Sequence, residues 1–272
     1  MQYAIIISEK DPAGINIREC LLQLCPFKEI NRLESHPAHK YRNCRIYTIG
    51  EESVRAENID KKIEADLFIF ATRHQSKQGI HSLSCHSPGN WSKADFGGQG
   101  SKLCIAPALK LKQAYLELKK HQKSVQDHDI TLECTHHGPY LEKPALYIEI
   151  GSTEEHWKNK KAGNIIAQVI MNITEKPPLE DQQIAVGIGG PHYCNNFKKI
   201  IERTGIAVGH ICPKYHLENL DEQLLKQAIE KTKEKVDFIL LDWKGLGKEK
   251  GRIKNILNKL NIEYKRIDKL MQ

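Results

Sequence analysis

Histidine and glutamate side chains gather near the ends of the strands predicted for this chain. Imidazole nitrogen and carboxylate oxygen are ligands that zinc prefers, and a catalytic zinc keeps one position open for water. The ends of strands are also where α/β folds place their sites. For each histidine taken alone, a role in the core or in binding phosphate or substrate stays open. The candidates are His74, His81, His86, Glu133, His136, His137, Glu149, His192 and His210.

The spacing of these residues is not that of a known metal motif, since no H-E-x-x-H occurs. Glu133 lies in a predicted strand, Ile130–Thr135. If the alternation of that strand continued, Glu133 and His137 would share one face and His136 would point to the other.

A glycine-rich turn, Gly187 to His192, follows a predicted strand and precedes a helix. Backbone N–H groups at Gly189 and Gly190 could approach an oxyanion or phosphate closely, although a plain tight turn explains the same pattern. No G-x-S-x-G elbow occurs, which argues against that type of serine hydrolase. A cysteine nucleophile stays open, because Cys85, Cys134 and Cys194 each lie near a histidine in the sequence.

Short β-branched runs alternate with amphipathic segments, which predicts an α/β fold with helices on both faces of a mostly parallel or mixed sheet. Ser152 and Glu155 have the spacing of a capping box at a helix start. We expect one three-layer domain over residues 1–272. The predicted strands are Tyr3–Ile7, Arg45–Ile49, Leu67–Ala71, Ile130–Thr135, Ala145–Ile150, Ile184–Ile188, Ala207–Ile211, Phe238–Asp242 and Glu263–Ile267, and the predicted helices are Ile15–Leu24, Pro107–His121, Asn196–Arg203 and Asp221–Lys235, with two more after Ser152 and around Ile253–Leu260.

The stretch from Thr72 to Lys102 shows almost no apolar periodicity. A structureless loop of this length is uncommon in a compact domain and is usually functional or mobile. Its aromatic residues, Trp91 and Phe96, could stack on a base or anchor the loop.

Composition and charge limit the class of protein. The chain has 272 residues, 40% of them hydrophobic, and no apolar run approaches the roughly 20 residues that cross a bilayer. The N-terminus lacks the pattern of a signal peptide. We therefore expect a cytoplasmic protein without membrane contact, in which the eight cysteines are reduced.

The net charge of +7 permits an anionic partner such as RNA. Residues 244–270 hold nine basic residues against three acidic ones. This C-terminal edge is either a solvated helix face or a surface that contacts phosphates.

Several stretches of the chain resemble the archaeal and plant type of D-aminoacyl-tRNA deacylase, almost from end to end. Two of them, His136-His137-Gly138-Pro139-Tyr140 and Glu149-Ile150-Gly151-Ser152-Thr153, are specific. The others are Ala71-Thr72-Arg73-His74-Gln75-Ser76, His86 with Gly89-Asn90-Trp91, Gly189-Gly190-Pro191-His192-Tyr193, and Gly209-His210-Ile211 with Pro213-Lys214-Tyr215.

The resemblance implies zinc-dependent hydrolysis of the ester between a D-amino acid and the 3′-terminal adenosine of tRNA, broad for the side chain. It also implies a fold like that of phosphorylases and peptidyl-tRNA hydrolases, and two zinc ions per chain. We expect His137, His74 and Glu133 in catalysis and His86, His136, Glu149 and His192 on the metal, although the sequence does not separate the two roles. Gly189 and Gly190 would stabilise the oxyanion, and Arg73, Lys250, Arg252 and Lys254 would contact the RNA.

Two other functions stay open. One is a zinc-dependent amidase or peptidase acting on small acylated substrates, which would share the site but not the RNA. The other is a non-catalytic RNA-binding protein with structural histidines. We expect a monomer, because the sequence has no coiled coil or evident interface helix.

Overall fold

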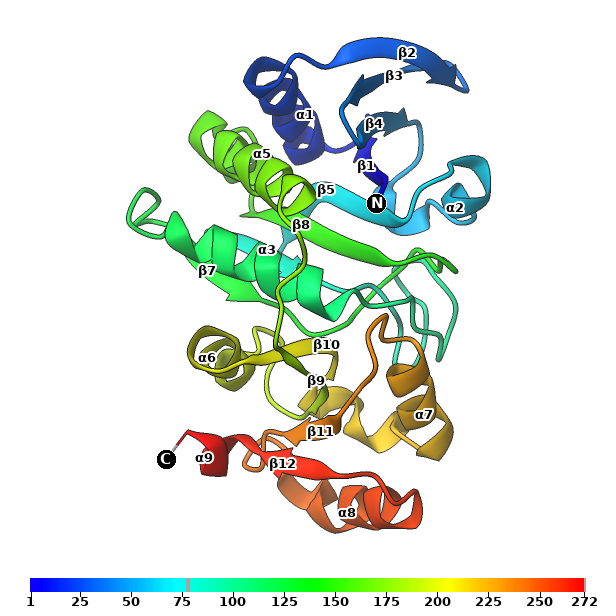
Figure 1. Ribbon diagram of the computed structural model, residues 1–272, viewed down its shortest axis with the longest axis vertical. Helices are drawn as coiled ribbons and strands as arrows, with labels where there is room; N and C mark the ends of the chain where they lie inside the picture. The colour runs from blue at the N-terminus through cyan, green and yellow to red at the C-terminus, as the bar shows by residue number, and fades with distance from the viewer. Residues whose placement is uncertain (77–78, 272) are drawn as a thin grey trace.

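The fold rests on a mixed eight-stranded sheet (Figure 1). A computed structural model describes residues 1–76 and 79–271. The strand order is β2-β3-β4-β1-β5-β8-β6-β7; β1 is parallel to β4 and β5, β8 is parallel to β5, and β6 is antiparallel to β8 but parallel to β7. The strands are β1 (Tyr3–Ser8), β2 (Lys28–Leu33), β3 (His36–Tyr41), β4 (Cys44–Ile49), β5 (Leu67–Gln75), β6 (Ser82–His86), β7 (Asp129–Leu132) and β8 (Ala145–Ser152).

The two faces of this sheet are covered differently. β1 and β8 are buried at every position, as strands covered on both faces must be. Helices α1 (Pro12–Leu24), α3 (Ala108–Lys120) and α5 (Lys160–Glu175) pack on one face through a large apolar core. α1 begins at Asp11, whose carboxylate accepts the N–H groups of Ala13 and Gly14. The other face carries the short helix α2 (Ile59–Lys62), the 3-10 helix η1 (Ser53–Arg55) and the segment that follows β6.

A second sheet follows in the C-terminal part of the chain. Its four strands are all parallel, in the order β10-β9-β11-β12. Of the described helices, none is both long and apolar enough to cross a membrane. The remaining elements are β9 (Gln183–Ile188), β10 (Ile206–Cys212), β11 (Phe238–Leu241), β12 (Tyr264–Arg266), α4 (Glu154–Trp157), α6 (Asn195–Arg203), α7 (Glu222–Glu230), α8 (Lys250–Lys259), α9 (Ile267–Leu270), η2 (Lys214–Asn219) and η3 (Gly247–Glu249).

Helix α3 joins the two sheets. Its apolar side packs in the core beneath the first sheet, and that core continues into residues of β9, β10 and β11. From α3, Lys112 donates hydrogen bonds to Gln182 Oε1 (2.7 Å), to the Thr204 carbonyl (2.6 Å) and to the Ile206 carbonyl (3.0 Å), all beside the second sheet. Burial lowers the pKa of Lys112 to about 8. The ammonium is accommodated there because three acceptors surround it.

The mixed α/β fold with flanking helices is confirmed, and the predicted strands and helices are present with shifted ends. Three strands were not predicted: β2, β3 and β6. The prediction of a structureless loop from Thr72 to Lys102 is wrong, because β5 extends to Gln75 and β6 lies inside it; residues 77 and 78 lie outside the described residues. The predicted capping box is also wrong. Ser152 ends β8, Thr153 is the N-cap of α4, and the Thr153 hydroxyl contacts His156 Nδ1 at 2.8 Å.

Candidate functional site

Seven of the predicted site residues lie together where the first sheet meets the loops of the second. They come from strands β5, β6 and β8, from the segment after β7, and from the loop after β9. The seven are His74, His86, Glu133, His136, His137, Glu149 and His192. Because they derive from five separate segments, the fold and not the local sequence creates the site.

Glu149 lies on β8 between two strands that supply its partners. The register pairs it with Thr72 of β5 and with Ser84 of β6. Thr72 Oγ1 donates to Glu149 Oε1 at 2.9 Å, and Ser84 Oγ donates to Oε2 at 3.4 Å. His74 Nδ1 and His86 Nε2 each lie 3.6 Å from Oε2. Burial alone would raise the pKa of Glu149, but His74 and His86 hold it well below its ordinary value, so the carboxylate is ionised.

Glu133 is the second buried carboxylate, and it follows β7 instead of lying within it. Its Oε2 lies 2.9 Å from His192 Nε2 and 3.6 Å from His136 Nε2, and its Oε1 lies 3.3 Å from His74 Nδ1. Burial raises the pKa of Glu133, but His74 and His192 lower it below its ordinary value. Both carboxylates are therefore negatively charged and surrounded by imidazole nitrogens.

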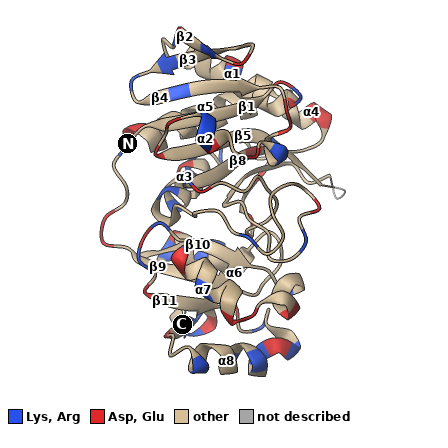
Figure 2. Cartoon of the chain, turned by 90° about the vertical axis from the view of Figure 1, so that its right-hand side faces the viewer, with Lys and Arg blue, Asp and Glu red and all other residues tan. Residues whose placement is uncertain are grey.

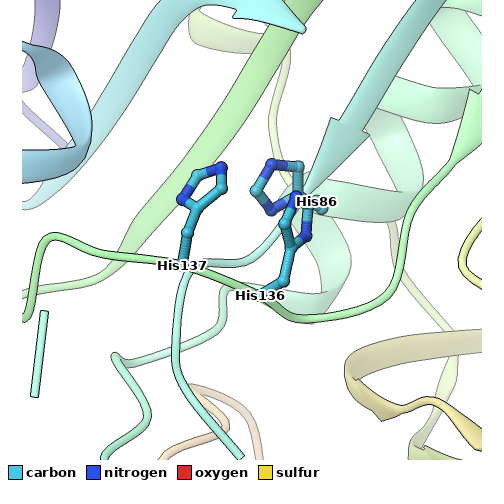
Figure 3. A group of neighbouring side chains, drawn as sticks. All are labelled: His86, His136 and His137. Carbon is cyan, nitrogen blue, oxygen red and sulfur yellow. The ribbon is translucent and has the colours of Figure 1, made fainter. Parts of the chain in front are cut away.

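Three imidazoles are held by backbone carbonyl groups. The Nδ1 atoms of His136, His137 and His86 lie 2.8, 2.8 and 3.2 Å from the carbonyl oxygens of Cys134, Gly138 and Ser87. A carbonyl only accepts, so each Nδ1 carries the hydrogen, and in a neutral ring this leaves the lone pair of Nε2 free. The rings gather at the end of β6, with centroids 4.1 to 4.8 Å apart (Figure 3). Burial lowers the pKa of His136 well below its usual value and that of His137 to about 4, so both rings are neutral.

The segment that carries these histidines is bonded to the second sheet. The N–H groups of Cys134 and Thr135 donate to the carbonyl oxygens of His192 (2.9 Å) and Ile211 (3.0 Å), and the Ile211 N–H donates to Thr135 Oγ1 at 3.1 Å. His137 adopts a φ of +45°, a conformation that costs a residue with a Cβ some free energy. The predicted alternation is therefore wrong: the chain turns here, and His136 and His137 face the same site.

The donor set fits metal ions. Two buried atoms, His86 Nε2 and Glu133 Oε1, find no hydrogen-bond partner among the described residues, which is costly unless a ligand satisfies them. Ligand atoms of His86, His136 and His137 lie within 4.8 Å of one another, and so do those of His74, Glu133 and His192. Two such groups of nitrogen and oxygen donors match what zinc requires, and in the first of them each imidazole is anchored through Nδ1 on a backbone carbonyl.

The Gly189–Gly190 turn, which leads to His192, was predicted to present its N–H groups to an oxyanion, but it packs against the second sheet. Both residues have positive φ, +101° and +84°, and both approach Asp242 closely. The Gly189 N–H donates to the Cys212 carbonyl at 2.8 Å, so it cannot also serve an oxyanion. The prediction of an oxyanion role is therefore wrong for Gly189, and it stays a prediction for the Gly190 N–H.

Several residues at the site were missed from the sequence. Tyr193 and Tyr215 place their hydroxyl groups 3.3 Å from His74 Nε2 and 3.0 Å from His192 Nδ1. Cys134 was not missed, since the sequence named it as a possible nucleophile; its Sγ lies 3.4 Å from the same His192 Nδ1. Thr72 and Ser84, which bind Glu149, were also missed. Their signal was present, because each stands two residues before a site histidine and so shares its face of a strand.

Arg73 directly precedes His74 on β5, but its side chain has other partners, and the remaining predicted RNA-binding residues lie apart from the cluster. Arg73 donates to the Lys10 carbonyl (3.0 Å) and to Glu52 (3.1 Å). Lys250 and Lys254 lie on α8, at the end of the molecule opposite β2 (Figure 2). Arg252 donates to the carbonyl groups of Leu217 and Leu220 and pairs with Glu249. Its guanidinium is therefore engaged in holding α8.

The two aromatic residues of the segment after β6 have different environments. Trp91 is 1% exposed and packs in the second core, so it anchors the segment. Phe96 is 71% exposed, and its carbonyl accepts the N–H of Gly138, one residue after His137. The backbone that carries this exposed ring is thus bonded beside the site.

Comparison with known proteins identifies the family. A sequence model of the D-aminoacyl-tRNA deacylase family matches residues 61–265. The chain is 38% identical to the D-aminoacyl-tRNA deacylase of Thermococcus onnurineus, covering 96% of this chain and 98% of that protein. It is also 38% identical to that of Methanosarcina barkeri, covering 95% and 87%. A crystal structure of a conserved protein of unknown function, 30% identical, matches with a TM-score of 0.91 over 98% of this chain and 96% of that one. The chain belongs to the D-aminoacyl-tRNA deacylase family.

Proposed function

We propose that this chain is an esterase that hydrolyses the bond between a D-amino acid and the 3′-terminal adenosine of tRNA, releasing free tRNA and the D-amino acid. The observation that carries the proposal is the convergence of seven histidines and glutamates, from five segments, in a chain that belongs to this family. The D-amino acids it accepts would be varied, as the resemblance implies.

We assign the metal-binding role to His86, His136 and His137, and a second position to His74, Glu133 and His192. Bound zinc would lower the pKa of a coordinated water toward about 7 and polarise the ester carbonyl. His137 is thus assigned to metal binding and not to catalysis as a base, because its Nδ1 is fixed on Gly138 and its Nε2 faces His86 and His136.

We assign the proton transfers of the hydrolysis to side chains of the site. Glu133 Oε1 is buried and ionised, and it has no hydrogen-bond partner among the described residues although His74 Nδ1 lies 3.3 Å away. It accepts a proton from the attacking water and passes that proton to the leaving ribose oxygen. Burial lowers the pKa of His74, but Glu133 and Glu149 raise it above its ordinary value. Tyr193, at hydrogen-bond distance from His74 Nε2, orients that ring.

Substrate binding uses groups around this site. The exposed ring of Phe96 would stack on a base at the 3′ end of the tRNA. Arg73, Lys250 and Lys254 would contact phosphates, while Arg252 supports α8. We infer a single domain, since one apolar core includes residues of both sheets. We also propose that the chain acts as a monomer in the cytoplasm.

The test compares D-tyrosyl-tRNA with L-tyrosyl-tRNA before and after chelation. Loss of the D-amino acid alone, abolished by chelation and restored by zinc, is the expected result. Loss of D-tyrosine that survives chelation would keep the activity but contradict the metal. No loss from tRNA, with hydrolysis of small acylated substrates, would favour an amidase. Binding of tRNA without hydrolysis would favour an RNA-binding protein.

A further inference from the structure

A second group of metal-ligating side chains lies on the opposite face of β6 and β7. His81 precedes β6 and His128 precedes β7, and the register pairs Ser82 with Asp129. The Asp129 N–H donates to the His81 carbonyl at 2.8 Å, which keeps the two strand starts together. Alternation along the strands places His81 on the side of Leu83, away from Ser84 and His86 of the site above.

The side chains of this group converge on one carboxylate. His128 Nδ1 lies 3.1 Å from Asp127 Oδ1, and His81 Nδ1 lies 4.0 Å from Asp127 Oδ2. One ligand atom from each of the three lies within 4.8 Å of the others. The side chain of His128 is 1% exposed, whereas that of Asp127 is 66% exposed. The side chain of His81 is 43% exposed, so the group is buried at His128 and open to solvent at His81 and Asp127.

The polar atoms here are short of hydrogen bonds. Nε2 of His128 is buried and finds no hydrogen-bond partner within the part of the chain that the structure describes, and the buried Nδ1 atoms of His128 and His81 face only the Asp127 carboxylate without a well-formed hydrogen bond. A buried nitrogen without a partner costs roughly 1–3 kcal/mol. The ring therefore stands where a ligand would satisfy it.

The geometry points to a further metal site, apart from the two positions assigned above, in which His81, His128 and Asp127 bind one Zn²⁺ or a similar divalent cation. Two imidazoles and a carboxylate leave a fourth position for water on the exposed side. His156 forms a wall of the site: its ring centroid lies 3.6 Å from that of His81, and its Nδ1 contacts Thr153 Oγ1 at 2.8 Å and accepts the Ser152 N–H at 3.4 Å. With Nδ1 accepting, Nε2 carries the hydrogen, so His156 is not a ligand.

Such an ion would fasten the starts of two strands that lead to the esterase site. β6 continues to Ser84 and His86, and β7 continues to Glu133. The role is structural, because the ligands face away from the residues assigned to hydrolysis. The inference does not depend on the proposed function.

The experiment counts metal ions per chain. Metal-free full-length protein is loaded with Zn²⁺, dialysed and analysed by mass spectrometry, and Co²⁺ binding is followed by visible absorption. His128→Phe, which preserves ring volume, should bind one ion fewer than the unmodified chain, and Asp127→Asn should bind that ion at least about tenfold more weakly. The matched control is His121→Asn, in the turn between α3 and β7, which should change nothing. Glu149→Gln, at the other site, should keep the ion assigned here.

An unchanged metal count and affinity in His128→Phe would overturn the proposal and leave a metal-free pair of His128 and Asp127. If His128→Phe does not fold, His81→Asn answers the same question at a half-buried position. Retention of the full metal count in that variant would equally overturn the proposal. None of these readouts uses tRNA, so failure of the proposed function would not affect them.

Discussion

The histidines on the two faces of β6 and β7 differ in how their rings are held. At the esterase site, His86, His136 and His137 each place Nδ1 on a backbone carbonyl oxygen. On the other face, Nδ1 of both His81 and His128 is turned toward the single carboxylate of Asp127. The three esterase histidines are fixed by the backbone before any ligand binds. The pair of His81 and His128 is completed only by the exposed side chain of Asp127.

This difference bears on what each group can do. Rings fixed through Nδ1 present Nε2 in a set direction, which is the preorganisation that catalysis requires. Rings that face an exposed carboxylate can hold an ion but have no fixed opening toward a substrate. The same residue types thus give a reactive site in one place and a structural one in the other.

The largest difference between the two faces is expected at their carboxylates, Glu149 and Asp127. Glu149→Gln should lower hydrolysis of D-aminoacyl-tRNA by at least about a hundredfold, because a buried carboxylate that faces His74 and His86 loses its charge. Asp127→Asn should leave turnover unchanged. Both are measured as kcat/KM on D-tyrosyl-tRNA. Comparable losses in the two variants would mean that the two faces are not functionally separate.

A smaller effect is expected from the hydroxyl groups that support each face. Thr72→Val keeps the shape but removes the donor to Glu149, so turnover should fall about tenfold and the free energy of unfolding by about 1 kcal/mol. Thr72→Ser should restore turnover. Thr153→Val, which removes the contact to His156, should not change it. Full activity in Thr72→Val would show that Glu149 needs no support from β5.

If the exposed ring of Phe96 stacks on a base, as proposed, then the esterase face is the one that meets RNA. Phe96→Ala should raise KM for D-tyrosyl-tRNA about tenfold and leave kcat unchanged, since stacking on a base contributes roughly 1–3 kcal/mol. Hydrolysis of a small D-tyrosine ester should not change. Leu24→Ala, at an exposed position of α1, is the control. A loss confined to kcat would argue against stacking.

The smallest effect is expected at the C-terminal edge. Replacing Lys250 and Lys254 by Ala should weaken tRNA binding a few-fold and reduce the slope of log K against log salt by about 1.5. The pair Lys28→Ala and Lys40→Ala, at the β2–β3 edge, is the matched control because it removes the same charge. Equal slopes in both double variants would leave α8 as a solvated surface.

The elements that could be predicted from the sequence are those with a continuous apolar run, such as β1 and β11, or with a strong amphipathic pattern, such as α3. β2 and β3 could not, because β2 is the edge strand and carries charged residues on exposed positions, and β3 beside it has two half-buried histidines in place of an apolar alternation. β6 was missed because its site face consists of Ser82, Ser84 and His86, so small polar residues replaced the usual apolar alternation.

The members of the site could be proposed from their types and positions, but their roles could not. Which nitrogen of His136 or His137 is free depends on a carbonyl group that the turn brings within reach. The Gly189 N–H is engaged because β10 runs beside it, and Arg252 is engaged because η2 ends beside α8. These partners are distant in sequence, so no local pattern indicates them.

The hydrogen bonds from Cys134 and Thr135 to the second sheet couple the unfolding of the two sheets. Metal ions bound jointly by residues of the first sheet and of the loops of the second sheet would raise the free energy needed to separate the two sheets. This increase grows with the metal concentration. The amide hydrogens of Cys134 and Thr135 lie on that boundary, bonded to His192 and Ile211. Their exchange with deuterated water would therefore slow as the metal loads, and these two amides would report site occupancy in the absence of any substrate.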